Sequence, residues 1–508
     1  MRTKISPRSN VTPTRRPSRI RGLAGSRPAP SSRPIWLAAS LVWLAAAPLS
    51  AQLIAEGRSW IPGFSERSRH GEALATGDFN GDGFDDLAVG SPLLDWSTFD
   101  DSGFVRIHFG GPRGITSTGA ADLTFRESSL LGGQSGTGDR FGAALASADF
   151  DLDGFDDLAI GIPGKTIDGD NNAGRVAVVY GLADVGIDAT RVTFLDQDVL
   201  EGEADWSERF GSALAAGPLG GDSYPDLVIG SPGEVVGGFL NAGAVHVVLS
   251  DDATGLQPAG NAMITQDTPN AFGVAAPGDR FGSALVLGDV TGDGDPDLIV
   301  GSPGDWVGGE QGSGAVQMFP GGANGVAITP SQLVWHQDVA GVLGDSASGD
   351  DFGDALALAD FDGDGHLDLA IGVPGESQFG PEASGAVQIL YGTPSGLSVD
   401  GDQVLFESLI SPEISRFDRF GDVLAAGDFS ADGRDDLAIG FPLDNVFGAM
   451  NSGNVAVLYG TPDGLQTVGS QLWNGFVLLT VEDGDQLGGA LAVGDFSGRG
   501  GVGLALGV

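Results

Sequence analysis

The sequence predicts an all-β fold assembled from seven copies of one module. A loop rich in aspartate and glycine occupies residues 78–87, and an apolar run follows it. Intact copies begin at Asp149, Asp289, Asp360 and Asp428, and eroded copies begin at Pro218 and Asp495. Successive starts lie 67 to 71 residues apart. A nearly constant period of this length is typical of repeat architectures, in which one supersecondary unit is repeated.

Each module contains the pattern of four short strands. A first apolar strand precedes the loop, and Phe-Gly introduces it at 141–142, 210–211, 281–282, 352–353 and 420–421. A second strand follows the loop and ends at Gly-x-Pro, as in residues 160–164. The third strand is apolar, as in 385–391, and the fourth is more polar, as in 332–336. Such units are typical of propeller blades, so we predict a seven-bladed β-propeller of four-stranded blades.

The intact loops have the composition of calcium sites. Each has an oxygen-bearing side chain at positions 1, 3, 5 and 9 and a turn-forming glycine at position 6. Calcium takes roughly six to eight oxygen ligands, and a backbone carbonyl, here at position 7, supplies one more. The EF-hand alternative requires a glutamate at position 12, where the first loop has Val89. We therefore predict calcium-binding hairpin loops that hold about five Ca²⁺ ions.

The predicted ligands fall into five sets. They are Asp78, Asn80, Asp82, Phe84 and Asp86; Asp149, Asp151, Asp153, Phe155 and Asp157; Asp289, Thr291, Asp293, Asp295 and Asp297; Asp360, Asp362, Asp364, His366 and Asp368; and Asp428, Ser430, Asp432, Arg434 and Asp436. The second and fourth sets contain four carboxylates each and should bind most tightly. The two eroded loops should bind no ion. In the last of them, we expect the guanidinium of Arg499 to pair with Asp495 in its place.

These motifs resemble the FG-GAP repeat family, the seven-bladed β-propeller that forms the head of integrin α subunits. The resemblance rests on Phe-Gly, the aspartate loop and Gly-x-Pro, and it covers nearly the whole chain after residue 51. It implies calcium in the hairpins between the first two strands of several blades, and a ligand surface on the opposite face. His70-Gly71 and Leu487-Gly488 depart from Phe-Gly, and the last repeat stops after its second strand.

The N-terminal segment has the layout of a secretory signal. Residues 1–51 hold nine of the 25 basic residues and no acidic ones, and they end in an apolar run at 35–49 and a small-residue pair. We predict a signal peptide at 1–51, with an uncleaved anchor as the alternative, and one propeller at 52–508. Residues 52–60 could add an outer strand to the incomplete last blade. Alternatively, the chain is a fragment, that blade is thin, or a partner strand fills it.

The charge of the exported part restricts its partners. Without residues 1–51, 16 basic residues face 68 acidic ones, a net charge of −52. Such a surface repels nucleic acid and anionic lipid. The chain has no cysteine, so disulfides cannot stabilise it. We expect a secreted or cell-surface protein with no stable membrane span in its mature chain.

No enzyme signature is present. The five histidines occupy non-equivalent places in different repeats, and most regular carboxylates are assigned to metal. The expected function is an extracellular adhesion or ligand-binding module with mainly structural calcium, whose partner is a protein or glycan. We expect the contact surface at connections such as 93–102 and 233–241. The alternatives are a carbohydrate-binding or polysaccharide-active envelope protein, for which Trp96, Trp306 and Trp335 would cluster, and a hydrolase.

Overall fold

The computed structural model describes most of the chain after residue 70. The described residues are 71–507 apart from 96, 116–121, 201–203, 220, 251–254, 272, 323–324, 329–332, 412–413, 447 and 475–482. All of them belong to one compact unit, 47–508. The predicted signal peptide at 1–51 and the predicted outer strand at 52–60 lie outside the described residues.

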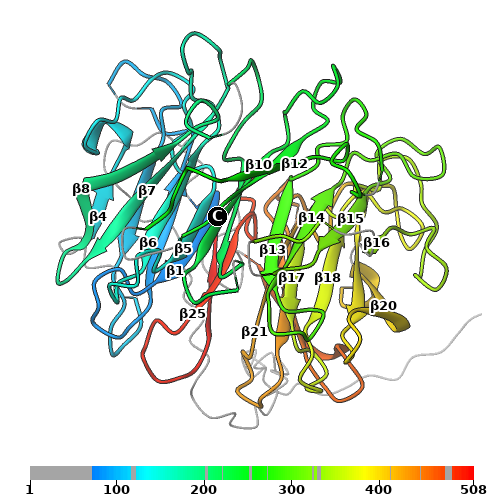
Figure 1. Cartoon of the computed structure of the whole chain (residues 1–508). Helices are drawn as coiled ribbons and strands as arrows, with labels where there is room; N and C mark the ends of the chain where they lie inside the picture. The colour runs from blue at the N-terminus through cyan, green and yellow to red at the C-terminus, as the bar shows by residue number, and fades with distance from the viewer. Residues whose placement is uncertain are drawn as a thin grey trace, which may run out of the picture. The chain divides into compact units, whose positions relative to one another are not determined.

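Blades 1 to 3 are each built from four consecutive antiparallel strands (Figure 1). Blade 1 consists of β1 (Ala73–Gly77), β2 (Asp86–Ser91), β3 (Phe104–His108) and β4 (Leu123–Phe125). Blade 2 consists of β5 (Leu145–Ala148), β6 (Asp157–Ile162), β7 (Arg175–Leu182) and β8 (Gly186–Leu195). Blade 3 consists of β9 (Ala213–Gly217), β10 (Asp226–Ser231), β11 (Ala244–Val248) and β12 (Ala262–Ile264).

Blades 4 to 6 repeat the same strand order. Blade 4 consists of β13 (Ala284–Gly288), β14 (Asp297–Ser302), β15 (Ala315–Phe319) and β16 (Leu333–Trp335). Blade 5 consists of β17 (Leu356–Ala359), β18 (Asp368–Val373), β19 (Ala386–Tyr391) and β20 (Ser398–Phe406). Blade 6 consists of β21 (Val423–Gly427), β22 (Asp436–Phe441), β23 (Asn454–Tyr459) and β24 (Gln466–Asn474). Two 3-10 helices, η1 (Glu127–Ser129) and η2 (Glu407–Leu409), follow β4 and β20.

The predicted seven four-stranded blades are wrong, because the described residues form a six-bladed propeller. The seventh repeat contributes only a two-stranded hairpin, β25 (Leu491–Gly494) and β26 (Gly503–Leu506). The first strands of consecutive blades contact one another in order, and β25 contacts both β21 and β1.

Hydrogen bonds join the hairpin to the first blade. The Thr76 hydroxyl donates to the carbonyl of Val493 at 2.7 Å. The backbone N–H of Asp495 donates to the Asp85 carboxylate at 2.6 Å, and the N–H of Asp85 donates to the carbonyl of Asp495 at 3.2 Å. Residues more than 400 positions apart therefore close the ring.

The recurrent Phe-Gly and Gly-x-Pro motifs meet between neighbouring blades. In Gly-x-Pro of blade 2, a Cβ atom on Gly161 would lie 2.1 Å from the carbonyl oxygen of Gly211, which belongs to Phe-Gly of blade 3. Only glycine permits this approach of two backbones. Phe210 beside it is fully buried and packs with Val176 and Ile229. Residues of these two motifs thus form the contacts between one blade and the next.

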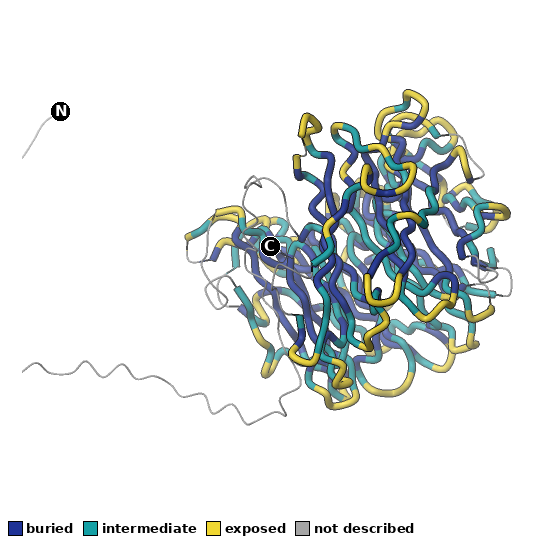
Figure 2. The backbone as a smooth tube through the Cα atoms, turned by 90° about the vertical axis from the view of Figure 1, so that its left-hand side faces the viewer, coloured by how far each residue is buried: buried dark blue, intermediate teal, exposed yellow. Residues whose placement is uncertain are grey.

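The hydrophobic core lies between the blades. One buried cluster combines Val105 and Phe125 of blade 1 with Phe141, Ile160 and Val179 of the second repeat. Figure 2 shows buried residues along the strands and exposed residues gathered in the connections at the strand ends. Burial of aliphatic and aromatic side chains stabilises such a fold by about 1.5 to 3 kcal/mol for each large side chain.

Antiparallel order divides the connections between two faces. The loops between the first and second strands lie at one end of each blade, which we call the hairpin face. The loops between the second and third strands lie at the other end, beside the connections that enter the next blade; for example, the N–H of Gly138 donates to the carbonyl of Asp100 at 2.8 Å. Within the described residues, no helix combines the length and hydrophobicity needed for a bilayer crossing.

Candidate metal centres in the hairpin loops

The aspartate at position 9 is an architectural residue of every blade. In blade 2, one oxygen of Asp157 accepts from the N–H of Phe150 at 2.9 Å, and the other accepts from the N–H of Gly181 at 2.8 Å. The first bond holds the start of the loop, and the second holds the end of the third strand, 24 residues away. The equivalent carboxylates are fully buried: Asp86, Asp157, Asp226, Asp297, Asp368 and Asp436.

The aspartate at position 1 folds the loop around its own carboxylate. Asp149 accepts from the N–H groups of Asp153 at 3.0 Å and Gly154 at 2.8 Å. Asp360 makes the same kind of bonds to Gly363 and Gly365, at 2.8 and 2.9 Å. Turns of this kind place successive side chains of positions 1 and 3 on the inside of the loop.

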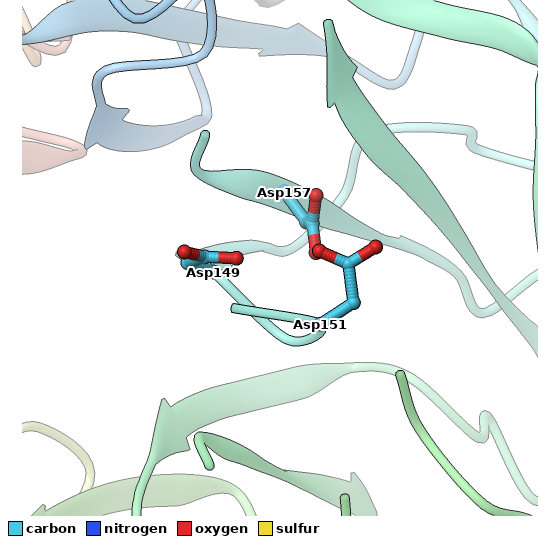
Figure 3. Close-up of side chains that lie close together, drawn as sticks. All are labelled: Asp149, Asp151 and Asp157. Carbon is cyan, nitrogen blue, oxygen red and sulfur yellow. The ribbon is translucent and has the colours of Figure 1, made fainter. Parts of the chain in front are cut away.

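Two loops bring three carboxylates together. One oxygen each from Asp149, Asp151 and Asp157 lies within 4.8 Å of the others, and the same holds for Asp360, Asp362 and Asp368. In Figure 3, the carboxylates of Asp151 and Asp157 face one another and Asp149 lies across from them. Hard oxygen ligands at this spacing suit Ca²⁺. Without a cation, like charges so close repel one another.

The three loops with a neutral residue at position 3 differ from these two. Asn80 donates its amide to Asp86 at 3.3 Å, and its Oδ1 atom has no hydrogen-bond partner. The hydroxyl of Thr291 also has none, although both atoms are buried. The Ser430 hydroxyl lies 3.4 Å from Asp428. Asn80 and Thr291 therefore present oxygen atoms that an ion could use.

The position 5 carboxylates do not join the clusters within 4.8 Å. Asp82, Asp153, Asp293, Asp364 and Asp432 each accept from the N–H of the position 7 residue, at 2.9 to 3.1 Å. The assignment of these carboxylates and of the position 7 carbonyls as ligands stays a prediction.

Arginines lie in or beside three of the loops. Arg191 on β8 forms an ion pair with Asp151, and its guanidinium lies 3.8 Å from the centre of the Tyr180 ring. Arg434 pairs with Asp432 at 2.5 Å. In the seventh repeat, the expected pairing of Arg499 with Asp495 is wrong, because the guanidinium donates to the carbonyl of Pro112 at 2.9 Å. The sequence could not show this, since Pro112 belongs to blade 1.

Burial raises the pKa of the position 9 carboxyl groups. It raises the pKa of Asp86 and Asp157 to about 8 and that of Asp368 to about 7. Their backbone N–H donors oppose this because they stabilise the charged form. A bound cation would act in the same direction as these donors. The loops thus contain carboxyl groups whose charge a metal ion would favour.

The eroded third loop separates the two roles of these aspartates. It lacks carboxylates at positions 1 and 3, where Pro218 and Gly220 stand. Asp226 nevertheless accepts from the N–H groups of Leu219 and Ser250, both at 2.7 Å. Sequence reasoning assigned position 9 to metal alone. The sequence did contain a sign of its structural role, because Asp226 is present at position 9 of a loop that lacks acidic residues at positions 1 and 3.

Of the three tryptophans whose clustering would favour the carbohydrate-binding alternative, the two described ones lie in different environments. Trp335 is 4% exposed and packs in the core, while Trp306 is 52% exposed, and Trp96 lies outside the described residues. Trp335 ends β16, the fourth strand, and its side chain points into the interface between blades. Other exposed apolar side chains on the face opposite the hairpin loops are Phe99, Phe239, Leu240 and Met450.

Comparison with known proteins agrees with this architecture. The FG-GAP repeat model matches residues 70–108, 141–179, 210–248, 281–317 and 352–390. Phosphatidylinositol-glycan-specific phospholipase D of Bos taurus is 36% identical over 189 residues, which are 36% of this chain and 21% of that protein. Integrin alpha-PS2 of Drosophila melanogaster is 31% identical over 245 residues, 47% of this chain and 15% of that protein.

Integrin alpha-IIb of Homo sapiens is 34% identical over 172 residues, 33% of this chain and 15% of that protein. A solved structure of an Agrocybe aegerita lectin that recognises non-reducing terminal N-acetylglucosamine covers 80% of both chains, with a TM-score of 0.43 and 14% identity. The chain spans about a fifth or less of the length of the phospholipase and integrin relatives.

The fold and its loops define a β-propeller with repeated aspartate hairpins. Five segments of the chain match the FG-GAP repeat, and parts of it are similar in sequence to integrin α subunits, which together support an FG-GAP, integrin α-like β-propeller.

Proposed function

We propose that the chain is a secreted or cell-surface propeller that binds calcium in five hairpin loops and binds an extracellular ligand on the opposite face. The observation that carries the calcium part is the repeated convergence of three carboxylates at the second and fifth repeats. Calcium would neutralise these charges and fix the loops, so its role is mainly structural. The protein would act by binding and not by catalysis.

The ligand part rests on where exposed apolar side chains gather. Phe99, Phe239, Trp306 and Met450 are 38% to 64% exposed and lie in equivalent connections between the second and third strands of four blades. Aromatic side chains that protrude from loops on a rigid scaffold are common recognition elements. This is the face at which the family resemblance of the sequence implies a ligand surface.

The calcium proposal can be tested by location. Crystals grown with calcium should show anomalous peaks in the loops that begin at Asp78, Asp149, Asp289, Asp360 and Asp428. The loops that begin at Pro218 and Asp495 should show none. Peaks in two or fewer of the five loops, or in all seven, would contradict the proposal.

The ligand proposal requires a matched pair of surface variants. We expect Trp306→Ser combined with Phe239→Ser to weaken binding to a panel of purified extracellular matrix proteins about tenfold or more. Val185→Ser is the control, because Val185 is 50% exposed in the turn between β7 and β8, on the hairpin face. A glycan array tests the alternative ligand class. Equal effects of both variants, or binding by glycans alone, would count against a protein-binding loop surface.

A further inference from the structure

A second set of buried polar groups lies at the junctions between blades, away from the hairpin loops. Each junction brings together three residues. The first follows the fourth strand of one blade, the second lies just before the Phe-Gly motif of the next blade, and the third follows the Gly-x-Pro motif of that next blade. The five trios are Glu127, Asp139 and Lys165; Gln197, Glu208 and Glu234; Gln266, Asp279 and Asp305; Gln337, Asp350 and Glu376; and Glu407, Asp418 and Asp444.

Four of these trios contain a nitrogen donor. In the first, the ammonium of Lys165 donates to Glu127 at 2.8 Å and to Asp139 at 3.0 Å. In the next three, a glutamine amide donates to the acid after Gly-x-Pro; for example, Gln337 donates to Glu376 at 2.5 Å. A buried carboxylate is therefore compensated at each of these junctions.

The last trio has no such donor. One oxygen each from Glu407, Asp418 and Asp444 lies within 4.8 Å of the others, and the three residues are 2%, 0% and 5% exposed. Neither carboxylate oxygen of Glu407 has a hydrogen-bond partner, nor does Oδ1 of Asp418. Asp444 accepts from the side-chain amide of Asn454, and Asp418 accepts from the N–H of Ser415.

We propose that Glu407, Asp418 and Asp444 hold a hard divalent cation, with calcium as the best candidate, between blades 5 and 6. Two observations carry this. Unpartnered carboxylate oxygens of a buried side chain face the other two acids, and the equivalent place in the first trio is filled by the ammonium of Lys165. Three carboxylates suit a hard ion such as Ca²⁺ or Mg²⁺ and disfavour metals that prefer sulfur or nitrogen.

The competing way to neutralise this cluster is protonation. Without a cation, burial and then the charges of Asp444 and Asp418 raise the pKa of Glu407. A proton shared between two of the acids would satisfy one oxygen pair, whereas a divalent ion would contact all three side chains. The two accounts predict different ion counts, so they can be separated.

The test uses two isosteric and reciprocal variants. Glu407→Gln recreates the arrangement found at three other junctions, and Gln337→Glu gives the fourth junction an all-carboxylate trio. We expect Glu407→Gln to lose one bound calcium per chain and Gln337→Glu to gain one, measured by elemental analysis after gel filtration. Circular dichroism in calcium should show that both variants keep the wild-type fold.

Diffraction from wild-type crystals soaked in manganese decides the case even if a variant fails to fold. An anomalous peak between Glu407, Asp418 and Asp444 is the expected result. No peak there, or an unchanged ion count in folded Glu407→Gln, would overturn the proposal in favour of a protonated cluster. The position of the peak keeps this test separate from the five hairpin loops, whose occupancy can succeed or fail independently.

Discussion

The loops of blades 2 and 3 adopt the same hairpin with different chemistry. Both keep a buried position 9 aspartate, Asp157 and Asp226, that accepts two backbone N–H bonds. Only the first adds carboxylates at positions 1 and 3, and these converge on Asp157. The hairpin of blade 3 forms without them.

The position 9 aspartate holds the hairpin in both blades, whereas the carboxylates at positions 1 and 3 are not needed to form it. Strand pairing and one aspartate are enough for the architecture, because Asp226 pairs with Gly217 at the end of β9 as Asp157 pairs with Ala148. The additional charges of blade 2 make the loop less stable unless a cation is bound. Bound calcium, as proposed for blades 2 and 5, would offset this repulsion.

Calcium removal should produce the largest effect. When the free calcium concentration is a hundredfold the dissociation constant of a site, binding at that site adds about 2.7 kcal/mol to the free energy of unfolding. Several such sites together could exceed the whole stability of an ordinary domain. We expect chelation by EDTA to lower the melting temperature sharply at low ionic strength. Sodium chloride should restore only the part that is due to charge screening. An unchanged melting curve would show that the loops of blades 2 and 3 are equally self-supporting.

Asp226→Ala should destabilise the protein to the same extent with and without calcium. It leaves the buried N–H groups of Leu219 and Ser250 without an acceptor, at a cost of about 2 to 4 kcal/mol. Urea denaturation in calcium and in EDTA measures this. Asp222→Ala is the control, because its carboxylate is exposed and, among the described residues, accepts from the N–H of Tyr224 at 3.0 Å. A calcium-dependent loss in Asp226→Ala would mean that blade 3 also binds an ion.

Removing one charge from a converging trio should weaken that site alone. We expect Asp151→Asn and Asp362→Asn to raise the dissociation constant of their loops on the order of tenfold, and Asn80→Ala to have a smaller effect. Arg191→Gln should tighten the second loop, because its guanidinium pairs with Asp151. Calcium titration by calorimetry gives these values. The ranking fails if Asp151→Asn is silent while Asn80→Ala abolishes the tightest site.

The smallest effect concerns a junction that we do not assign to metal. Burial, followed by the charge of Glu234 among its neighbours, raises the pKa of Glu208 to about 8. Glu208 then binds a proton more tightly in the folded state than in the unfolded state, where the pKa of a glutamate is about 4.3. This contribution to stability is complete below about pH 4 and is lost as the pH rises through about 8.

The stability of Glu208→Gln relative to the wild type should therefore be higher at pH 8 than at pH 5, with calcium saturating at both pH values. Urea midpoints at the two pH values measure the difference. Glu382→Gln is the control, because that carboxylate is 61% exposed. A parallel shift of both variants would show that general surface charge, and not the junction, sets the pH dependence.

Much of the fold could be predicted from local signals. Phe-Gly, the aspartate loop and Gly-x-Pro each recur with a nearly fixed spacing, so the strands on either side of each hairpin loop follow from the sequence. The predicted number of four-stranded blades was wrong because the last repeat was counted as a full blade, although its motif extends through only two strands. The sequence also did not show that Arg499 contacts Pro112 or that Glu407 lies beside Asp418 and Asp444. These residues come from different repeats, and only the packing of the blades brings them together.

The hairpin that completes the ring has a consequence for how the chain folds. Thr76 meets Val493 across 417 positions, so blade 1 cannot gain its contact with β25 until the chain has been synthesised as far as β25. Contacts between distant residues carry a large entropic cost and form late. Blades 1 to 6 can pack one after another as they emerge, and the joining of β25 to β1 is then the final step. Until that step, the side of blade 1 that packs against β25 lacks its neighbour, and incompletely packed surface of this kind favours aggregation.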